Sequence, residues 1–218
     1  MIRISEEGKF KEGRGKGTGA DYKPWIKIRE VSSRGTACTI QDYKHGREVH
    51  LLSQGEMYFY YLLRWDDNVV DIREQYPLDL QETKQICDEL HWIHPNNGKT
   101  HMTTDLLVTY ADGSLVAYSV KSDPKDLDNP RTVEKLHIEE VYWKRRGVKF
   151  KLVFKSDVNR VKVRNIMAAV SCYDPKNVQD AFGALRHKIA HKELTVDMDK
   201  PIDYRAMLRA LGGAQEMQ

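Results

Sequence analysis

The stretch TTDLLVTYADGSLVAYSVK, residues 103–121, decides the fold of this chain. Two runs rich in β-branched and aromatic residues flank an Ala-Asp-Gly loop at 111–113, a pattern that predicts an antiparallel hairpin. A two-residue turn would place Asp105 opposite Val120. A three-residue loop, with its glycine in the left-handed bulge position, places Asp105 opposite Ser119 instead.

We favour the second register because it gathers the apolar side chains on one face of the hairpin. These are Leu106, Val108, Tyr110, Val116, Tyr118 and Val120. The other face then presents Asp105 and Ser119 together, with Lys121 as a diagonal neighbour within reach of a long side chain. The hairpin therefore predicts a polar cluster at one end of an otherwise apolar sheet.

The segments on either side of the hairpin predict an α/β fold with a mixed sheet. A helix is expected to begin at Ser53, because Ser53 and Glu56 have the spacing of a capping box. The predicted elements are a helix at 53–65, strands at 68–76, 102–110 and 115–121, a helix at 130–146 and a strand at 148–154. In this α-β-β-β-α-β order the last helix is a crossover, so the final strand is expected to be parallel to its neighbour.

The two ends of the chain predict different structures. Residues 8–19 are rich in glycine and basic residues and predict a flexible arm along a nucleic-acid backbone, and residues 25–31 alternate as in a short strand. Beyond residue 155 a small, mostly helical appendage is expected. Its predicted elements are a helix capped by Ser156 that runs to about 172, helices at 177–191 and 204–211, and a strand at 194–197. We therefore expect domains at 1–155 and 156–218.

Composition limits the class of protein. The 218 residues include 40% hydrophobic and 31% charged residues, as expected for a globular chain. No apolar run is long enough to span a membrane, and no secretory signal is expected at the N-terminus. The three cysteines are far apart in the sequence, which favours a reducing compartment and argues against a disulfide framework or a cysteine-rich zinc site.

Charge is unevenly distributed although the net charge is only +3. Residues 51–90 are rich in acids, whereas residues 9–34 and 144–164 are rich in bases. This distribution suits an enzyme that binds phosphates with bases and metal ions with carboxylates, although charge runs are also common on solvated surfaces. The candidate DNA contacts are Lys11, Arg14, Lys16, Lys144, Arg145, Arg146, Lys149 and Lys151.

The polar face of the hairpin has the residue types of a metal-dependent nuclease. Carboxylates such as Asp105 and Glu56 can hold divalent cations, and Lys121 can orient water or neutralise charge that develops on a phosphate. The spacing alone is equally compatible with a cross-strand ion pair between Asp105 and Lys121. Glu56, in turn, has a simpler role available in the capping box.

Several segments strongly resemble the TnsA family, the endonuclease subunits of heteromeric cut-and-paste transposases. The resemblance runs in order through residues 9–155, and it is carried by KEGRGKGTGADYKPW (11–25), HLLSQGE (50–56), LRWDDNVVDIREQYPL (63–78), TTDLLV (103–108), SVK (119–121) and RTVEKLHIEEVYWKRRGVKF (131–150). It implies a restriction-endonuclease-like catalytic domain and a C-terminal part that is winged-helix-like and contacts partner proteins.

The resemblance also implies roles for individual residues. Glu56, Asp105 and Lys121 take the family's catalytic positions, and the carbonyl of Val120 is a further metal ligand. Glu139 takes an acidic position near the site, although the sequence also permits an i,i+4 pair with Lys135. The family carries Gln or Glu where this chain has Ser119, which would reach a metal only through water. Glu74 and Gln75 are expected beside the site.

The implied function is Mg²⁺-dependent cleavage of the 5′, non-transferred strand at transposon ends, with one or two ions and with Mn²⁺ as a substitute. The implied partners are double-stranded DNA, a separate RNase-H-like (DDE-type) transposase and an AAA+ regulator. The implied location is the bacterial cytoplasm, in association with the nucleoid, and not a membrane. Two alternatives are a stand-alone resolvase or repair nuclease with the same core, and a non-catalytic scaffold that binds DNA and partners.

Overall fold

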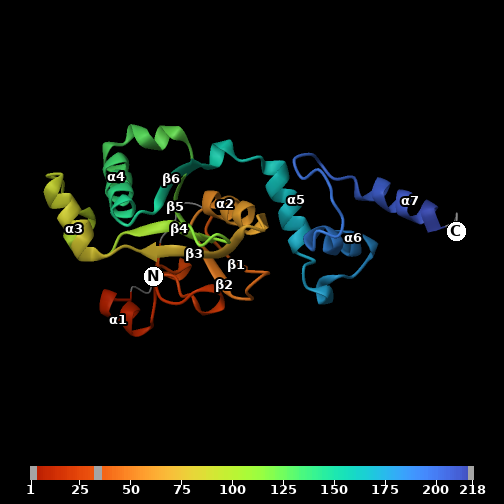
Figure 1. The fold of residues 1–218 in the computed structure, drawn as a ribbon, viewed down its shortest axis with the longest axis horizontal. Coiled ribbons are helices and arrows are strands. Elements are labelled where there is room, and N and C mark those ends of the chain that lie inside the picture. The colour runs from red at the N-terminus through yellow and green to blue at the C-terminus, as the bar shows by residue number, and fades with distance from the viewer. Residues whose placement is uncertain (1–3, 32–35, 216–218) are drawn as a thin grey trace. The chain divides into compact units, whose positions relative to one another are not determined.

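The computed structural model describes residues 4–31 and 36–215 (Figure 1). The chain divides into two compact units, Met1–Asp157 and Val158–Gln218, and each is described here by itself. Within the described residues, no helix is both long and apolar enough to cross a membrane.

A four-stranded sheet forms the centre of the first unit. Its order is β3-β4-β5-β6, with β3 at Val69–Pro77, β4 at Thr103–Tyr110, β5 at Leu115–Lys121 and β6 at Lys149–Phe154. The first three strands are antiparallel neighbours, and β6 is parallel to β5. Helix α4 (Pro130–Arg145) makes the crossover between β5 and β6, which confirms the predicted mixed sheet.

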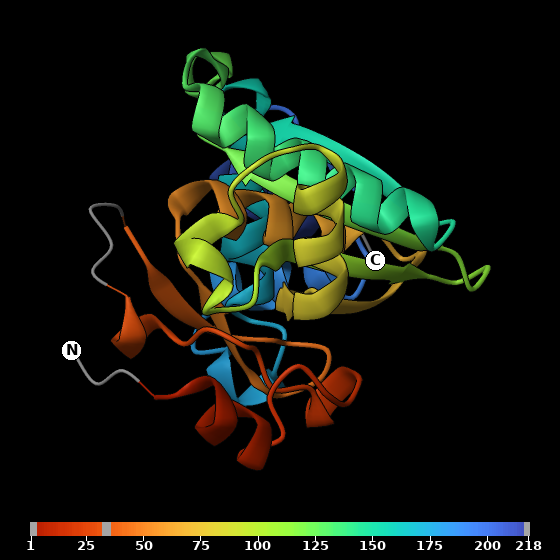
Figure 2. The same ribbon diagram turned by 90° about the vertical axis from the view of Figure 1, so that its left-hand side faces the viewer.

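Helices cover both faces of this sheet. Helix α2 (Gln54–Trp65) packs through Tyr60 against one face. Helix α3 (Leu80–Glu89), which the sequence analysis did not predict, packs beside α4 on the other face (Figure 2). Leu107 and Ala117 of the sheet lie in the core on this second face. The sheet is therefore covered on both faces, by α2 on one side and by α3 and α4 on the other.

The hairpin has the predicted register. Leu106 pairs with Tyr118 and Thr109 with Leu115, as a three-residue loop requires. Gly113 has a φ of 81° and donates its amide to the carbonyl of Tyr110, so it occupies the expected left-handed position. The predicted apolar face is also confirmed, because its residues belong to or pack against one buried cluster.

The N-terminal segment is folded, so the prediction of a flexible basic arm is wrong. Helix α1 (Glu6–Lys11) and the 3-10 turns at Gly19–Asp21 and Ile28–Glu30 pack on the first unit, and residues 25–31 form no strand. Arg14 is only 1% exposed, and its guanidinium makes a bidentate pair with Glu30 at 2.7 Å from each nitrogen. The buried charge is satisfied by this pair, which holds the segment in place.

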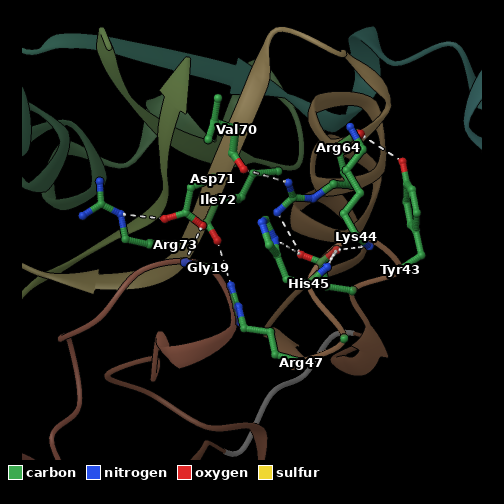
Figure 3. Close-up of polar contacts among 12 residues, drawn as sticks. Gly19, Tyr43, Lys44, His45, Arg47, Arg64, Val70, Asp71, Ile72 and Arg73 are labelled. Atoms are coloured by element: carbon green, nitrogen blue, oxygen red, sulfur yellow. Dashed lines mark hydrogen bonds and ion pairs between the residues drawn. The ribbon is translucent and has the colours of Figure 1, made fainter. Parts of the chain in front are cut away.

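A second, two-stranded sheet, which the sequence analysis missed, consists of β1 (Cys38–Gln41) and β2 (Glu48–Leu51). A buried polar network ties it to α2 and β3 (Figure 3). Asp42 and Arg64 form an ion pair of 2.8 Å with both side chains fully buried. Arg47 donates to the carbonyl of Ile72 and to the carboxylate of Glu74, both at 2.7 Å.

The second unit contains helices α5 (Arg160–Val170), α6 (Ala181–Ala190) and α7 (Tyr204–Gln215), with a 3-10 turn at Pro175–Asn177. Asn159, and not the predicted Ser156, caps α5 by accepting from two helix amides. The predicted strand at 194–197 is wrong, because these residues have no regular structure and lead into a turn at 198–199, where the side chain of Asp197 accepts from the amide of Asp199. No strand occurs among the described residues of this unit.

Candidate active site

Asp105 lies where the pairing of β4 with β5 ends. The last regular pair is Leu106 with Tyr118, and beyond it Oδ2 of Asp105 accepts the backbone amide of Val120 at 2.7 Å. A side chain therefore takes up an amide that a strand partner would otherwise bind. This bond fixes the Asp105 carboxylate to the backbone of the neighbouring strand.

Lys121 and Ser119 lie beside this carboxylate, as the preferred register predicted. The Nζ atom of Lys121 is 3.9 Å from Oδ2 of Asp105 and donates to Oγ of Ser119 at 3.1 Å and to the carbonyl of Val120 at 3.2 Å. The Ser119 hydroxyl is 3.4 Å from Oδ2 of Asp105. Asp105 and Lys121 keep 20% and 26% of their side chains exposed, so a substrate can reach both.

Glu56 lies in the first turn of α2 and is buried. Its Oε1 accepts from the hydroxyl of Ser53 at 2.9 Å, and its Oε2 accepts from the amide of Leu52 at 2.9 Å and from Nε2 of Gln75 at 3.1 Å. Ser53 caps α2 as predicted, because its hydroxyl accepts from the amide of Glu56 at 3.1 Å, but the Glu56 carboxylate accepts from the amide of Leu52 and not from that of Ser53, so the capping box is incomplete. Burial, and next the negative charge of Asp105, raise the pKa of Glu56 to about 8. The Glu56 backbone therefore takes part in the cap, and its carboxyl lies close enough to Asp105 to feel that charge.

The sequence analysis expected both Glu74 and Gln75 beside the site, and the structure brings only Gln75 into contact with Glu56. It lies on β3 between Glu74, which pairs with Leu106, and Tyr76, which pairs with Thr104, and this brings it level with Asp105. Its φ of 48° is unusual for a residue with a side chain. Its amide bridges Glu56 and the hydroxyl of Thr103, which donates to Oε1 at 3.1 Å. Glu74, by contrast, pairs with Arg47 and has a structural role.

Glu139 approaches the site from α4 on the other face of the sheet and is buried. Its Oε1 accepts from Oγ1 of Thr104 at 2.7 Å, whereas Lys135, the candidate i,i+4 partner, is exposed. Burial, and next the charge of Asp105, raise the pKa of Glu139 to about 8, while hydrogen bonds from Thr104 and Ser119 oppose the rise. Asp105 is thus close enough to act on both buried glutamates.

A cleft of about 340 Å³ lies beside Asp105. Asp105, Ser119, Lys121 and Glu139 form part of its wall, whereas Glu56 does not line it. The rest of the lining comes from Pro95, Asn96, Thr100, His101, Met102, Thr103, Thr132, Lys135 and Leu136. Lys135 is exposed and is a basic residue of the cleft that the sequence analysis did not assign to DNA.

The oxygen donors at this cleft suit a hard divalent cation. Within the described residues, no group of three or more His, Cys, Asp or Glu side chains is arranged to hold a metal ion. Mg²⁺, however, commonly uses one or two carboxylates and completes its shell with water and substrate phosphate oxygens. Burial, and next the charge of Asp105, raise the pKa of Glu56 and of Glu139, and a divalent cation nearby would favour the ionised form of both carboxyls. Asp105 and the carbonyl of Val120 are oxygen donors of the type that Mg²⁺ or Mn²⁺ binds, and so is Glu56, although Glu56 does not line the cleft.

The basic residues predicted to contact DNA do not gather at the cleft. Arg14 is excluded by its burial against Glu30. Lys149 pairs with Val116, whereas Lys121 pairs with Phe154, so Lys149 lies about 16 Å along the sheet from Lys121 at the usual rise per residue.

The other basic residues of the predicted set lie on the surface. Arg145 and Arg146 are engaged in ion pairs with Glu89 and Glu82, and Lys151 lies over the ring of Tyr118. Lys11, Lys16 and Lys144 are exposed, and Lys11 also pairs with Glu7. For all of these residues except Arg14, a DNA contact stays a prediction.

Comparison with known proteins gives two matches. Residues 66–155 match a family model described as the TnsA-like endonuclease N-terminal domain. The transposon Tn7 transposition protein TnsA of Escherichia coli is 37% identical over 161 residues, which cover 72% of this chain and 59% of that protein. The chain thus spans about three-fifths of the length of this relative. The observed sheet and helices agree with the expected restriction-endonuclease-like fold class.

Proposed function

Because this chain belongs to the TnsA family, we propose that it is a transposition endonuclease subunit that hydrolyses a phosphodiester bond in DNA at the cleft beside Asp105. The observation that carries the proposal is the convergence of Asp105, Ser119 and Lys121 on one open strand end, with two buried glutamates against them. The matched family domain contains these three residues and Glu139, and Glu56 lies in the stretch before it.

The protein's own groups supply positioning and charge. The backbone amide of Val120 holds the Asp105 carboxylate, and Gln75 and Ser53 hold that of Glu56. Lys121 carries a positive charge where the charge of a phosphate develops during hydrolysis, which is the usual site of electrostatic stabilisation. Its ammonium is also placed to orient an attacking water.

Asp105, Glu56 and the carbonyl of Val120 would hold one Mg²⁺, or Mn²⁺ in its place, and Ser119 would contribute to a second ion only through water. When bound, the cation supplies Lewis-acid polarisation of the phosphate and lowers the pKa of water. We further propose cleavage of the 5′, non-transferred strand at transposon ends, together with a DDE-type transposase and an AAA+ regulator. The setting we propose is the bacterial cytoplasm, in agreement with the free cysteines.

The test is nicking of a transposon-end duplex in Mg²⁺, with and without the transposase, by the wild type and by Asp105→Ala and Lys121→Ala. Both variants should lose cleavage by about 10²-fold or more while they stay folded. Asp112→Ala is the matched control, because Asp112 is an exposed acid in the turn at the far end of β4. Cleavage that persists in Asp105→Ala would refute the site, wild-type protein without cleavage would favour a scaffold, and cleavage without the transposase would favour a stand-alone nuclease.

A further inference from the structure

A chain of two short hydrogen bonds runs from the core to Glu139. The indole Nε1 of Trp143 lies 2.7 Å from Oγ1 of Thr104, and that oxygen lies 2.7 Å from Oε1 of Glu139. All three residues are buried, and Thr104 is completely so. Thr104 directly precedes Asp105 on β4.

The direction of this chain follows from the chemistry of its members. An indole N–H can only donate, so Oγ1 of Thr104 must be the acceptor in the first bond. The hydroxyl has one hydrogen, and the Glu139 oxygen is the partner left for it. Oε1 of Glu139 is consequently held as an acceptor, and Oε2 is the oxygen that remains for the cleft.

The local backbone explains how Thr104 reaches Glu139. Tyr76, the partner of Thr104, packs against the core cluster of α3 and α4, whereas Ile72 packs on the opposite face. Regular alternation would place both on one face. Gln75, with its left-handed φ of 48°, lies between them. At this irregular point of the sheet Gln75 contacts Glu56, and Thr104 on the paired strand contacts Glu139.

Ser119 lies on the cleft side of Glu139. Its hydroxyl interacts with the Glu139 carboxyl and is 3.4 Å from Oδ2 of Asp105. Glu139 is thus held from the core by Thr104 and contacted from the cleft by Ser119. A carboxyl held in this way has little rotational freedom.

We propose that Thr104, itself held by Trp143, is a positioning residue that orients Glu139 so that one of its oxygens serves the cleft beside Asp105. The proposal rests on the proposed nuclease function for its catalytic consequence. Thr104 does not touch the substrate. Its whole effect passes through Glu139, and this dependence makes the idea testable by a double-mutant cycle.

The first measurement is the cleavage rate of Thr104→Val, which keeps the shape and removes the hydroxyl, and of Thr104→Ser, which keeps the hydroxyl. We expect Thr104→Val to lose about 10- to 100-fold, the usual effect of a residue that orients an active-site ligand, and Thr104→Ser to restore most of it. Thr109→Val, the same change near the other end of β4, should leave the rate unchanged. In a Glu139→Ala background, Thr104→Val should have no further effect, and a full additional loss there would overturn the proposal.

The second measurement needs no activity. The indole ¹⁵N–¹H resonance of Trp143, assigned by its loss in Trp143→Phe, should move in Thr104→Val and also in Glu139→Ala, because the two bonds share the Thr104 hydroxyl. It should not move in Asp112→Ala. A resonance that moves in Thr104→Val and stays fixed in Glu139→Ala would overturn the proposal. If the indole responds as expected and the wild type does not cut DNA, then the nuclease function fails and the positioning role stands.

Discussion

The Oδ2 atom of Asp105 accepts a hydrogen bond of 2.7 Å from the backbone amide of Val120. The carbonyl of Val120 accepts a hydrogen bond of 3.2 Å from the ammonium of Lys121. One residue of β5 thus orients both members of the polar pair through its main chain. Because a strand backbone inside a sheet is stiff, the distance between the Asp105 carboxylate and the Lys121 ammonium is fixed before any substrate binds.

This geometry predicts that Asp105→Glu fails although it keeps the charge. The longer side chain displaces the carboxylate from the Val120 amide by roughly the length of one bond, and misplacement of about 1 Å commonly costs about 10²-fold in rate. Cleavage in Mg²⁺ should fall by that order, whereas Asp112→Glu in the exposed turn should behave as the wild type. Near-normal cleavage by Asp105→Glu would show that the amide does not set the position of the carboxylate.

The space around Ser119 is too small for the longer Gln or Glu side chain that the TnsA family carries at this position. It is only 2% exposed and lies among Asp105, Lys121 and Glu139. Ser119→Gln should therefore overfill the site, with a loss of about 1–3 kcal/mol in stability and a lower cleavage rate. Ser119→Ala should lower the rate only a few-fold. Urea unfolding and a titration of rate against Mg²⁺ check both, and a faster Ser119→Gln enzyme would contradict the expectation.

The left-handed backbone of Gln75 can be separated experimentally from its amide. Gln75→Ala and Gln75→Gly both remove the hydrogen bond to Glu56, but only glycine adopts a φ of 48° without strain. The glycine variant should be more stable than the alanine variant by about 1 kcal/mol, and both should cleave DNA more slowly than the wild type. Equal stabilities would mean that the strain is not located at this residue.

Patterns within one hairpin were enough to predict the centre of the fold. The loop at 111–113 fixed the register that brings Asp105 to Ser119 and Lys121, because turn geometry and alternation are local properties. The crossover from α4 to a parallel β6 followed from the order of elements. The sequence analysis did not predict helix α3, although Asp79 caps it, because Ile86 and Cys87 are its only buried apolar residues and too few to mark an apolar helical face.

Contacts between residues far apart in the sequence explain why the roles of Arg14 and Glu139 were not predicted. The basic, glycine-rich segment looked unstructured, yet Arg14 finds its partner in Glu30 and is buried. Glu139 was assigned a possible pair with Lys135 four residues away, whereas its partner is Thr104 on another element. Neither partner can be found from helical or strand periodicity, since such contacts depend on how distant segments pack.

The salt dependence of DNA binding should separate the cleft from the rest of the basic surface. Lys135 lines the cleft, whereas Lys149 lies near the hairpin turn. If the phosphate backbone crosses the cleft, Lys135→Ala should lower the slope of log affinity against log salt by about one unit and weaken binding to all sequences alike. On that path Lys149→Ala should leave the slope unchanged, whereas a DNA contact at Lys149, as the sequence analysis predicted, would lower it. The reverse result would move the DNA path to the far end of the sheet.

The buried Glu139 makes folding stability depend on pH in a direction that can be worked out. Its pKa rises from the ordinary 4.5 to about 8 on folding, because burial and Asp105 disfavour the charged form. The folded protein therefore binds more protons than the unfolded chain between these values, and stability falls as pH rises through this range. We expect the wild type, without divalent cations, to be more stable toward urea at pH 6 than at pH 8.

Glu139→Gln, which cannot ionise and keeps an acceptor for Thr104, should flatten this dependence by up to about 1 kcal/mol per pH unit. Glu56 contributes with the same sign, so some slope should remain in Glu139→Gln. An unchanged slope in that variant would show that Glu139 is ionised in the folded protein throughout this pH range.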